Sequence, residues 1–237
     1  NICKSKHNIS LIITQKDKPR GRGKKMQYTP VKEKALELGL EVYQPDNINS
    51  KEAIDKIKKL KPDCIVVVAF GQILKEEILK LPKYGCVNIH ASLLPKYRGA
   101  APINWAIING EKETGITIME MEEGLDTGDI LKTKSIPIEE LDDSITVHDK
   151  LSLLGGKMIL ETLQELKNNT ITKTPQDDSL STYAPILSKD MGKINWNNSS
   201  RKILNLIRGL KPWPSAYTFY NNQSVKIHEA RRIEKFL

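Results

Sequence analysis

Apolar and polar positions divide the first ninety residues into strand-like and helix-like segments. Runs rich in apolar residues, typical of strands, occupy residues 9–14, 64–69 and 85–90. The run at 64–69 is continuously apolar, which is typical of a strand buried on both faces. Helical spacing occurs at residues 32–38, at 75–81 and in a segment opened by Asn49 and Ser50, with Glu52 three residues after Asn49. Strands that alternate with helices predict a parallel sheet covered by helices.

The second half of the chain continues with a different order of elements. The pattern predicts a helix at 101–109, a strand pair at 114–121 and 129–136, and a long helix from Ser144. The Gly155-Gly156 pair in that helix indicates a kink or close packing. Residues 168–190 are polar and without periodicity, which predicts a linker. A short helix at 200–209 and a hairpin around Asn221-Asn222 follow.

Positive charge is concentrated in two segments. The 237 residues carry a formal net charge of +8. Residues 16–25 hold six basic and one acidic residue, and residues 189–237 hold ten basic and three acidic, so the remainder is net −4. Pro19, Gly21 and Gly23 predict that the first segment is a loop. On charge alone, a nucleic-acid footprint and a merely solvated surface are equally supported.

Composition excludes several classes of protein. Hydrophobic residues at 39% and charged residues at 28% indicate a folded globular chain. No apolar run approaches the ~20 residues of a bilayer span, and no targeting pattern opens the chain, which predicts a soluble, intracellular protein. Three cysteines cannot form a disulfide framework. Cys64 and Cys86 lie in apolar runs and are predicted to be reduced core residues.

The strongest candidate for chemistry is the pair Asn88 and His90, at the carboxyl end of a predicted strand. Residues i and i+2 of a strand face the same side, so both side chains can address one substrate atom. Ligands of open α/β sheets bind at the carboxyl ends of strands. The residues alone leave a catalytic pair and ordinary structural residues equally supported.

Asp126, in the turn at 124–129, is a second candidate. A carboxylate beside a histidine favours the charged ring and fixes its orientation, which helps where an oxyanion develops. Asp129 begins the next predicted strand and is the weaker choice, and a structural Asx turn fits the spacing equally well. The glycines and lysines at 21–25 lack the spacing of a phosphate loop, and the chain has no dinucleotide-binding, zinc or serine-hydrolase signature.

Three motifs together resemble the 10-formyltetrahydrofolate-dependent formyltransferases. They are Asn88-x-His90-x-Ser92-Leu93-Leu94-Pro95, Tyr97-Arg98-Gly99-Ala100-Ala101-Pro102-Ile103 and the Gly-Leu-Asp-Thr-Gly-Asp turn at 124–129. The resemblance covers nearly the whole chain, and the basic segment and the turn point to the branch of the family that acts on methionyl-tRNA. It implies a Rossmann-like α/β catalytic domain with a mostly parallel sheet and flanking helices at 1–170, a linker at 171–188, and the beginning of a C-terminal OB-type β-barrel that binds tRNA at 189–237.

The resemblance also implies a reaction. The α-amine of initiator methionyl-tRNA attacks the formyl group of 10-formyltetrahydrofolate, giving formylmethionyl-tRNA for translation initiation. Asn88 and protonated His90 would hydrogen-bond the oxyanion, and Asp126 would keep His90 oriented and charged. The reaction needs no metal. The family likeness further implies a monomer in the bacterial cytoplasm.

Binding residues follow from the same resemblance. Folate is expected to contact Phe70, Gly71, Ile73, Leu74, Ser92, Leu93, Leu94, Pro95 and, through a loop at 141–143 that closes over the pterin, Asp143. The tRNA is expected to contact Arg22, Lys24, Lys25 and Lys211. The family's usual first strand, with its Gly-Thr-Pro turn, has no counterpart here and the barrel stops after one hairpin, so the chain is expected to be a fragment.

Two other functions remain open at this point. The first keeps the formyl donor but changes the acceptor to a sugar-nucleotide amine, to glycinamide ribonucleotide or to water, the last being a formyltetrahydrofolate hydrolase. Such relatives generally lack the basic loop and the RNA-binding domain. The second is a non-catalytic RNA-binding protein, which would lose tRNA affinity on charge reversal of the basic loop but would have no formyl transfer to lose.

Overall fold

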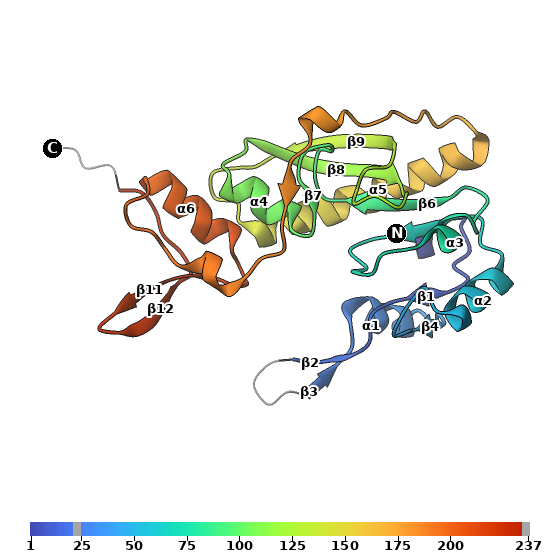
Figure 1. Cartoon of the computed structure of the whole chain (residues 1–237), viewed down its shortest axis with the longest axis horizontal. Helices are drawn as coiled ribbons and strands as arrows, with labels where there is room; N and C mark the ends of the chain where they lie inside the picture. The colour runs from blue at the N-terminus through green and yellow to red at the C-terminus, as the bar shows by residue number, and fades with distance from the viewer. Residues whose placement is uncertain (21–24, 234–237) are drawn as a thin grey trace.

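A mixed four-stranded sheet forms the centre of the computed structural model, which describes residues 1–20 and 25–233 (Figure 1). The strand order is β5 (Ile65–Val67), β6 (Cys86–His90), β8 (Glu113–Glu120) and β9 (Ile130–Pro137). β5 and β6 are parallel, whereas the β6–β8 and β8–β9 pairs are antiparallel. The predicted α/β class and the predicted β8–β9 pair are confirmed. The prediction that the sheet is mostly parallel is wrong for this central sheet, because β8 runs antiparallel to both of its neighbours.

The N-terminal part packs against the β5 side of this sheet. It contains η1 (Ile2–Lys4), β1 (Ile12–Ile13), α1 (Pro30–Glu37), β4 (Val42–Tyr43), α2 (Lys51–Leu60) and α3 (Glu76–Leu79), with β1 and β4 paired in parallel. Apolar side chains of α2 and α3 form one buried cluster with Cys86 of β6. Burial raises the pKa of Cys86 and of Cys64 to about 12, so both are protonated thiols at neutral pH, as predicted for reduced interior residues.

Three local predictions in this part need correction. Ser50 rather than Asn49 caps α2, because Ser50 accepts a hydrogen bond from the Ala53 amide while Asn49 bonds the backbone of the 73–75 segment. β5 is shorter than its apolar run and only half-buried, and the Val68 side chain that follows it is 57% exposed. The basic segment is not simply a loop, since β2 (Lys18–Arg20) and β3 (Lys25–Gln27) pair as an antiparallel ribbon.

The long helix α5 (Ser144–Asn168) packs on the central sheet and forms the main core with it. Val147, Leu151 and Met158 of this helix are buried against strand residues such as Ile118. A Cβ atom at Gly155 would lie 3.0 Å from Ile89 Cγ2, so the glycine permits close approach of helix and sheet. Of the two alternatives expected for the glycine pair, a kink or close packing, the structure shows close packing at Gly155.

The segment predicted as a linker runs along the central domain, and we call residues 171–188 the strap (Figure 1). It contains η2 (Asp178–Leu180) and β10 (Tyr183–Ala184). β10 pairs in parallel with β7 (Arg98–Gly99), and Thr174 forms a bridge with Ile130 of β9. The sequence indicated a polar linker, whereas the structure shows a segment that is hydrogen-bonded to β7 and β9 of the central domain.

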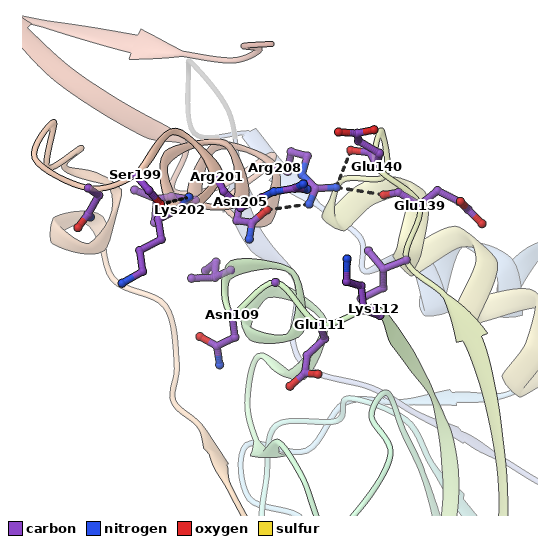
Figure 2. Close-up of a pocket in the computed structure, with 15 residues that line it drawn as sticks. Asn109, Glu111, Lys112, Glu139, Glu140, Ser199, Arg201, Lys202, Asn205 and Arg208 are labelled. Carbon is purple, nitrogen blue, oxygen red and sulfur yellow. Dashed lines mark hydrogen bonds between the residues drawn. The ribbon is translucent and has the colours of Figure 1, made fainter. Parts of the chain in front are cut away.

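The C-terminal part is built from η3 (Lys189–Gly192), α6 (Ser200–Gly209) and the predicted hairpin, β11 (Ala216–Tyr220) with β12 (Gln223–Ile227). α6 packs against α4 (Pro102–Ile108), and Asn104 Nδ2 donates to the Gly209 carbonyl over 2.7 Å. Beside this contact lies a groove of about 900 Å³ (Figure 2). Across it, Arg208 Nη1 donates to the carbonyls of Glu139, Glu140 and Asp142, which fastens α6 to the central domain. None of the helices within 1–20 and 25–233 is long and apolar enough to cross a membrane.

Candidate active site

The predicted chemistry lies where β5 and β6 end. Because these strands are parallel neighbours, with Val67 opposite Asn88, the segments that leave their carboxyl ends start at the same sheet edge. One is the 68–74 segment and the other is the 91–95 turn. Gln15, which follows β1, donates from Nε2 to the Phe70 carbonyl over 2.7 Å and joins the N-terminal part to this edge.

Asn88, His90 and Asp126 meet in space. Asn88 Nδ2 donates to Asp126 Oδ1 over 3.3 Å, and His90 Nδ1 lies 3.6 Å from Asp126 Oδ2. The Gly99 amide also donates to Asp126 Oδ2 over 2.8 Å. The side chains of His90 and Asp126 are only 6% and 13% exposed, so their charges interact in a weakly screened environment. The fold therefore brings together the three residues for which the sequence suggested catalytic roles.

The His90 ring is held on both sides. Nε2 lies 2.9 Å from the Tyr97 carbonyl oxygen, and since a carbonyl only accepts, Nε2 carries the proton in this contact. Nδ1 then faces the Asp126 carboxylate, with 3.6 Å between Nδ1 and Oδ2. Both ring nitrogens are thus directed at protein groups. The family resemblance implies that His90 donates directly to an oxyanion, but in this arrangement neither ring nitrogen points to a free position. Asn88 Nδ2 bonds Asp126 with only one of its two hydrogens.

The Ser92–Pro95 turn is held from inside. Ser92 is fully buried and donates to the Lys96 carbonyl, and Thr117 of β8 both donates to the Ser92 carbonyl and accepts from the Leu94 amide. Leu94 is buried as well, while Leu93 and Pro95 are half-buried. Ser92 and Leu94 shape the turn, so any ligand contact of the turn has to come from its backbone, Leu93 or Pro95.

The 68–74 segment presents a mixed surface. Ile73 is 76% exposed and Phe70 is half-buried, whereas Leu74 belongs to the core beside α2 and α3. Gly71 has a φ of +78° and Gln15 lies against it, so this position suits glycine alone. Of the predicted folate contacts here, Leu74 has a packing role, and Phe70, Gly71 and Ile73 are accessible.

Asp143 and Lys211 lie together at the junction of the two parts of the chain, although the sequence assigned them to different ligands. Asp143 Oδ2 is 3.0 Å from Lys211 Nζ, and Asp143 Oδ1 accepts from the Ile145 and Thr146 amides at the start of α5. Burial raises the pKa of Asp143, but the bonds from Thr146, Lys211 and Ile145 outweigh it and leave the pKa below its ordinary value. These contacts do not join Asp143 to Phe70 or to the Ser92 turn.

The other predicted RNA contacts are less fully described. Arg22 and Lys24 lie outside the described residues, and Lys25 begins β3. Their assignment to tRNA stays a prediction. The groove of Figure 2 is lined by residues of α4, α6 and the 138–140 turn, and Asn88, His90 and Asp126 are not among them. Among the described residues, no group of three His, Cys, Asp or Glu side chains is placed to hold a metal ion.

Four residues that contact this site received no role from the sequence. Gln176 and Thr182 come from the strap, and Tyr97 and Arg98 from the segment after the Ser92 turn. Tyr97 and Arg98 belong to a quoted motif, so the motif itself was a usable signal for them. Gln176 and Thr182 lie in a polar stretch without periodicity, and nothing in the single sequence marks them.

Comparison with known proteins covers both parts of the chain. The formyl transferase family model matches residues 2–163, and the model of the formyl transferase C-terminal domain matches residues 186–236. A methionyl-tRNA formyltransferase of Caldanaerobacter subterraneus is 56% identical, with 97% of this chain and 75% of the relative covered. The enzyme of the same name from Clostridioides difficile is 51% identical, with 99% of this chain and 76% of the relative covered.

Solved structures share the fold. A sugar N-formyltransferase from Shewanella has a TM-score of 0.70 at 26% identity, covering 85% of this chain and 81% of that one. HypX from Aquifex aeolicus, in complex with tetrahydrofolic acid, has a TM-score of 0.67 at 18% identity, covering 92% of this chain and 37% of that one. The Rossmann-like catalytic fold expected from the sequence is confirmed by these likenesses. The chain belongs to the formyl transferase family.

Proposed function

We propose that this chain transfers the formyl group of 10-formyltetrahydrofolate to the α-amine of methionyl-tRNA. The observation that carries the proposal is the meeting of Asn88, His90 and Asp126 at the carboxyl end of β6. Relatives 48 to 56% identical to the chain bear the name methionyl-tRNA formyltransferase, which favours this acceptor over a sugar amine or water.

Asn88 is the group best placed to stabilise the transition state. One hydrogen of its amide is used by Asp126, and the second is available for the oxygen on which negative charge develops. A preorganised donor in a water-poor site is worth about 2.7–4 kcal/mol of barrier. The contact with Asp126 fixes the amide plane before the substrate arrives, so the donor needs no reorientation during reaction.

His90 and Asp126 are proposed to manage the proton. The attacking amine loses a proton and N10 of the folate gains one, so the overall transfer is balanced. The imidazole and carboxylate are adjacent to Asn88 and lie 3.6 Å apart, which allows one proton to be held between them during the reaction. The Tyr97 carbonyl keeps the ring in the orientation that directs Nδ1 toward Asp126.

The formyl donor is proposed to bind along the same sheet edge. Of the expected folate contacts, Phe70, Gly71 and Ile73 after β5, and Leu93 and Pro95 after β6, are accessible. Leu74, Ser92 and Leu94 support these surfaces from the interior. We assign Asp143 to the domain junction instead of to the folate.

The tRNA is proposed to contact the basic segment and the C-terminal part. Arg22, Lys24 and Lys25 belong to a segment with six basic residues and one acidic residue, and residues 189–237 hold ten basic and three acidic. Lys211 is paired with Asp143 and is only 20% exposed, so we assign it to the junction; Arg201 and Lys202 are exposed on α6. We propose domain limits of 1–170 and 189–237 with the strap between them. A monomer in the bacterial cytoplasm remains a prediction.

The test is a comparison of acceptors with the full chain. With 10-formyltetrahydrofolate as donor, methionyl-tRNA, a sugar-nucleotide amine, glycinamide ribonucleotide and water are offered separately. We expect transfer to methionyl-tRNA, and its abolition in a His90→Ala variant. Charge reversal at Arg22 and Lys24 should weaken tRNA use and leave donor binding intact. Transfer only to a small amine, hydrolysis alone, or tRNA binding without transfer would refute the proposal.

A further inference from the structure

The side chain of Gln176 in the strap bonds the turn that carries Asp126. Gln176 Nε2 donates to the Asp126 carbonyl over 2.8 Å and to the Gly128 carbonyl over 2.7 Å. Gln176 Oε1 accepts from Arg98 Nε over 3.1 Å and from Arg98 Nη2 over 2.8 Å. An amide has two donor hydrogens and two acceptor lone pairs, so every hydrogen-bonding position of Gln176 is used.

The turn needs such support because its backbone is unusual. Asp126 has a φ of +53°, in the left-handed region that non-glycine residues rarely adopt. Residues in such conformations persist where the surrounding structure holds them, and they are frequent at functional sites. Gln176 donates to the carbonyls of the two residues that flank Thr127, and so fixes the orientation of the Asp126 side chain.

Arg98 and Gly99 close a ring of contacts around Asp126. The Arg98 guanidinium, 11% exposed, holds Gln176, while the next residue along the chain, Gly99, donates its amide to Asp126 Oδ2 over 2.8 Å. Gly99 and Arg98 form β7, which pairs with β10 of the strap. The backbone and the carboxylate of Asp126 are therefore both held by elements that are fastened to the strap.

The strap also holds the group that orients His90. Thr182 Oγ1 accepts from the Tyr97 amide over 2.8 Å, and the Arg98 amide donates to the Thr182 carbonyl over 2.9 Å. Tyr97 has a φ of +61°, and its carbonyl receives the His90 Nε2 hydrogen over 2.9 Å. One continuous segment thus supports Asp126 through Gln176 and His90 through Thr182.

We propose that Gln176 and Thr182 are positioning residues that set the geometry of the His90–Asp126 pair. The proposal rests on the proposed function for its catalytic consequence. The two residues touch no substrate, and their effect passes through the Asp126 turn and the Tyr97 carbonyl. Because a displacement of about 1 Å at a reacting group can cost on the order of 100-fold in rate, loosening the strap should reduce kcat and leave substrate binding unchanged.

The test uses the full chain and three substitutions, one at Gln176 and two at Thr182. Gln176→Glu keeps the acceptor for Arg98 but loses both donors to the turn, and we expect a 10- to 100-fold fall in kcat with KM for donor and methionyl-tRNA within twofold. Thr182→Val removes the acceptor for the Tyr97 amide and should also lower kcat, whereas Thr182→Ser should restore it. The matched control is Asp178→Asn, because Asp178 accepts from the same Arg98 over 2.7 Å but does not bond the turn.

A second readout does not depend on turnover. The proton on His90 Nε2 should give a protected NMR signal in the parent chain and in Thr182→Ser, and an exchanging signal in Thr182→Val. Full kcat in Gln176→Glu and Thr182→Val, an equal loss in Asp178→Asn, or a proportional rise in KM would overturn the proposal. If the parent chain formylates another amine, the proposed acceptor fails, and the same variants measured with that amine still decide the role of the strap.

Discussion

Two aspartates from similar acidic turns, Asp126 and Asp143, have different partners in the fold. Asp126 contacts the Asn88 amide, the Gly99 backbone amide and a histidine ring, which carries charge only when protonated. Asp143 caps α5 and pairs with the amino group of Lys211. A carboxylate that faces a permanent cation is already part of an ion pair. A carboxylate that faces an imidazole can instead share a proton with it.

The different partners of Asp126 and Asp143 indicate a role in the candidate active site for the first and a structural role for the second. Both side chains are largely buried, at 13% and 14% exposed, so burial by itself does not distinguish them. What distinguishes them is whether the partner can change its charge during a reaction. The aspartate that faces His90 belongs to the site, and the one that faces Lys211 joins the central domain to the C-terminal part.

The largest expected effect comes from removing the charge at each position. Asp126→Asn should lower the rate of formyl transfer by more than about 1,000-fold, because it removes the carboxylate that faces His90 Nδ1 and accepts from Asn88. Asp143→Asn should leave the rate within a few-fold of the parent chain. Initial rates with methionyl-tRNA measure both, and equal losses would abolish the distinction between the two aspartates.

Asn88 should give the next largest effect, because it is the proposed donor to the oxyanion and also bonds Asp126. Asn88→Ala should reduce kcat by about 100- to 1,000-fold, the usual cost of one oxyanion donor. Thermal unfolding of the variant should differ little from the parent, because the side chain is half-buried and bonds a single partner. A normal rate in this variant would remove Asn88 from the mechanism and weaken the case for Asp126.

Asp143 should influence stability more than activity. Asp143→Ala removes a helix cap and should cost about 1 kcal/mol of unfolding free energy, within the range of 0.5–2 kcal/mol known for such caps. Asp143→Asn keeps a capping oxygen and should recover most of that loss, with the remainder reporting the ion pair with Lys211. Urea unfolding of the two variants provides the measurement; no loss in either would contradict the architectural role.

The smallest expected effect is a decrease in the free energy of unfolding at acidic pH. Asp143 and its neighbour Asp142 have pKa values below the ordinary 3.8. Burial raises both pKa values, but hydrogen bonds and charge interactions lower them by more. The lowering comes from Thr146, Lys211 and Ile145 for Asp143, and chiefly from Lys150 for Asp142. A depressed pKa contributes stability that is complete above about pH 4 and is lost as the pH falls through the folded-state value. The stability difference between the parent chain and Asp143→Asn should therefore shrink below pH 4. A constant difference down to pH 2 would argue against the ion pair.

Features set by local pattern were predictable from the sequence. The helix at 200–209, the β8–β9 pair and the β11–β12 hairpin follow from periodicity and turn residues, and the structure confirms each of them. Asn88 and His90 were predictable as neighbours because alternate residues of a strand face the same side. Asp126 was predicted as a candidate catalytic residue from its place in a polar turn, but its position beside His90 became visible only in the fold.

Features that depend on distant partners were not predictable. The contact between Gln176 and Asp126 joins positions 50 residues apart, and that between Thr182 and Tyr97 joins positions 85 apart. The family resemblance led to the expectation that Asp143 contacts folate, and nothing local indicated its pairing with Lys211. Asn49 and Ser50 are both good caps, and only the nearby 73–75 backbone, which bonds Asn49, decided between them. For the two caps the local propensities were equal and tertiary contacts settled the choice, whereas the other contacts had no local signal at all.

The strap determines where this chain can be divided or recombined with a relative. A cut after residue 170, at the predicted domain limit, assigns Gln176 and Thr182 to the C-terminal fragment and leaves the Asp126 turn without its support. The Trp105 ring donates to the Pro185 carbonyl over 2.9 Å, which extends the attachment past β10. A hybrid enzyme that exchanges C-terminal parts should therefore be joined after Pro185, so that each central domain keeps residues 171–185 of its own strap.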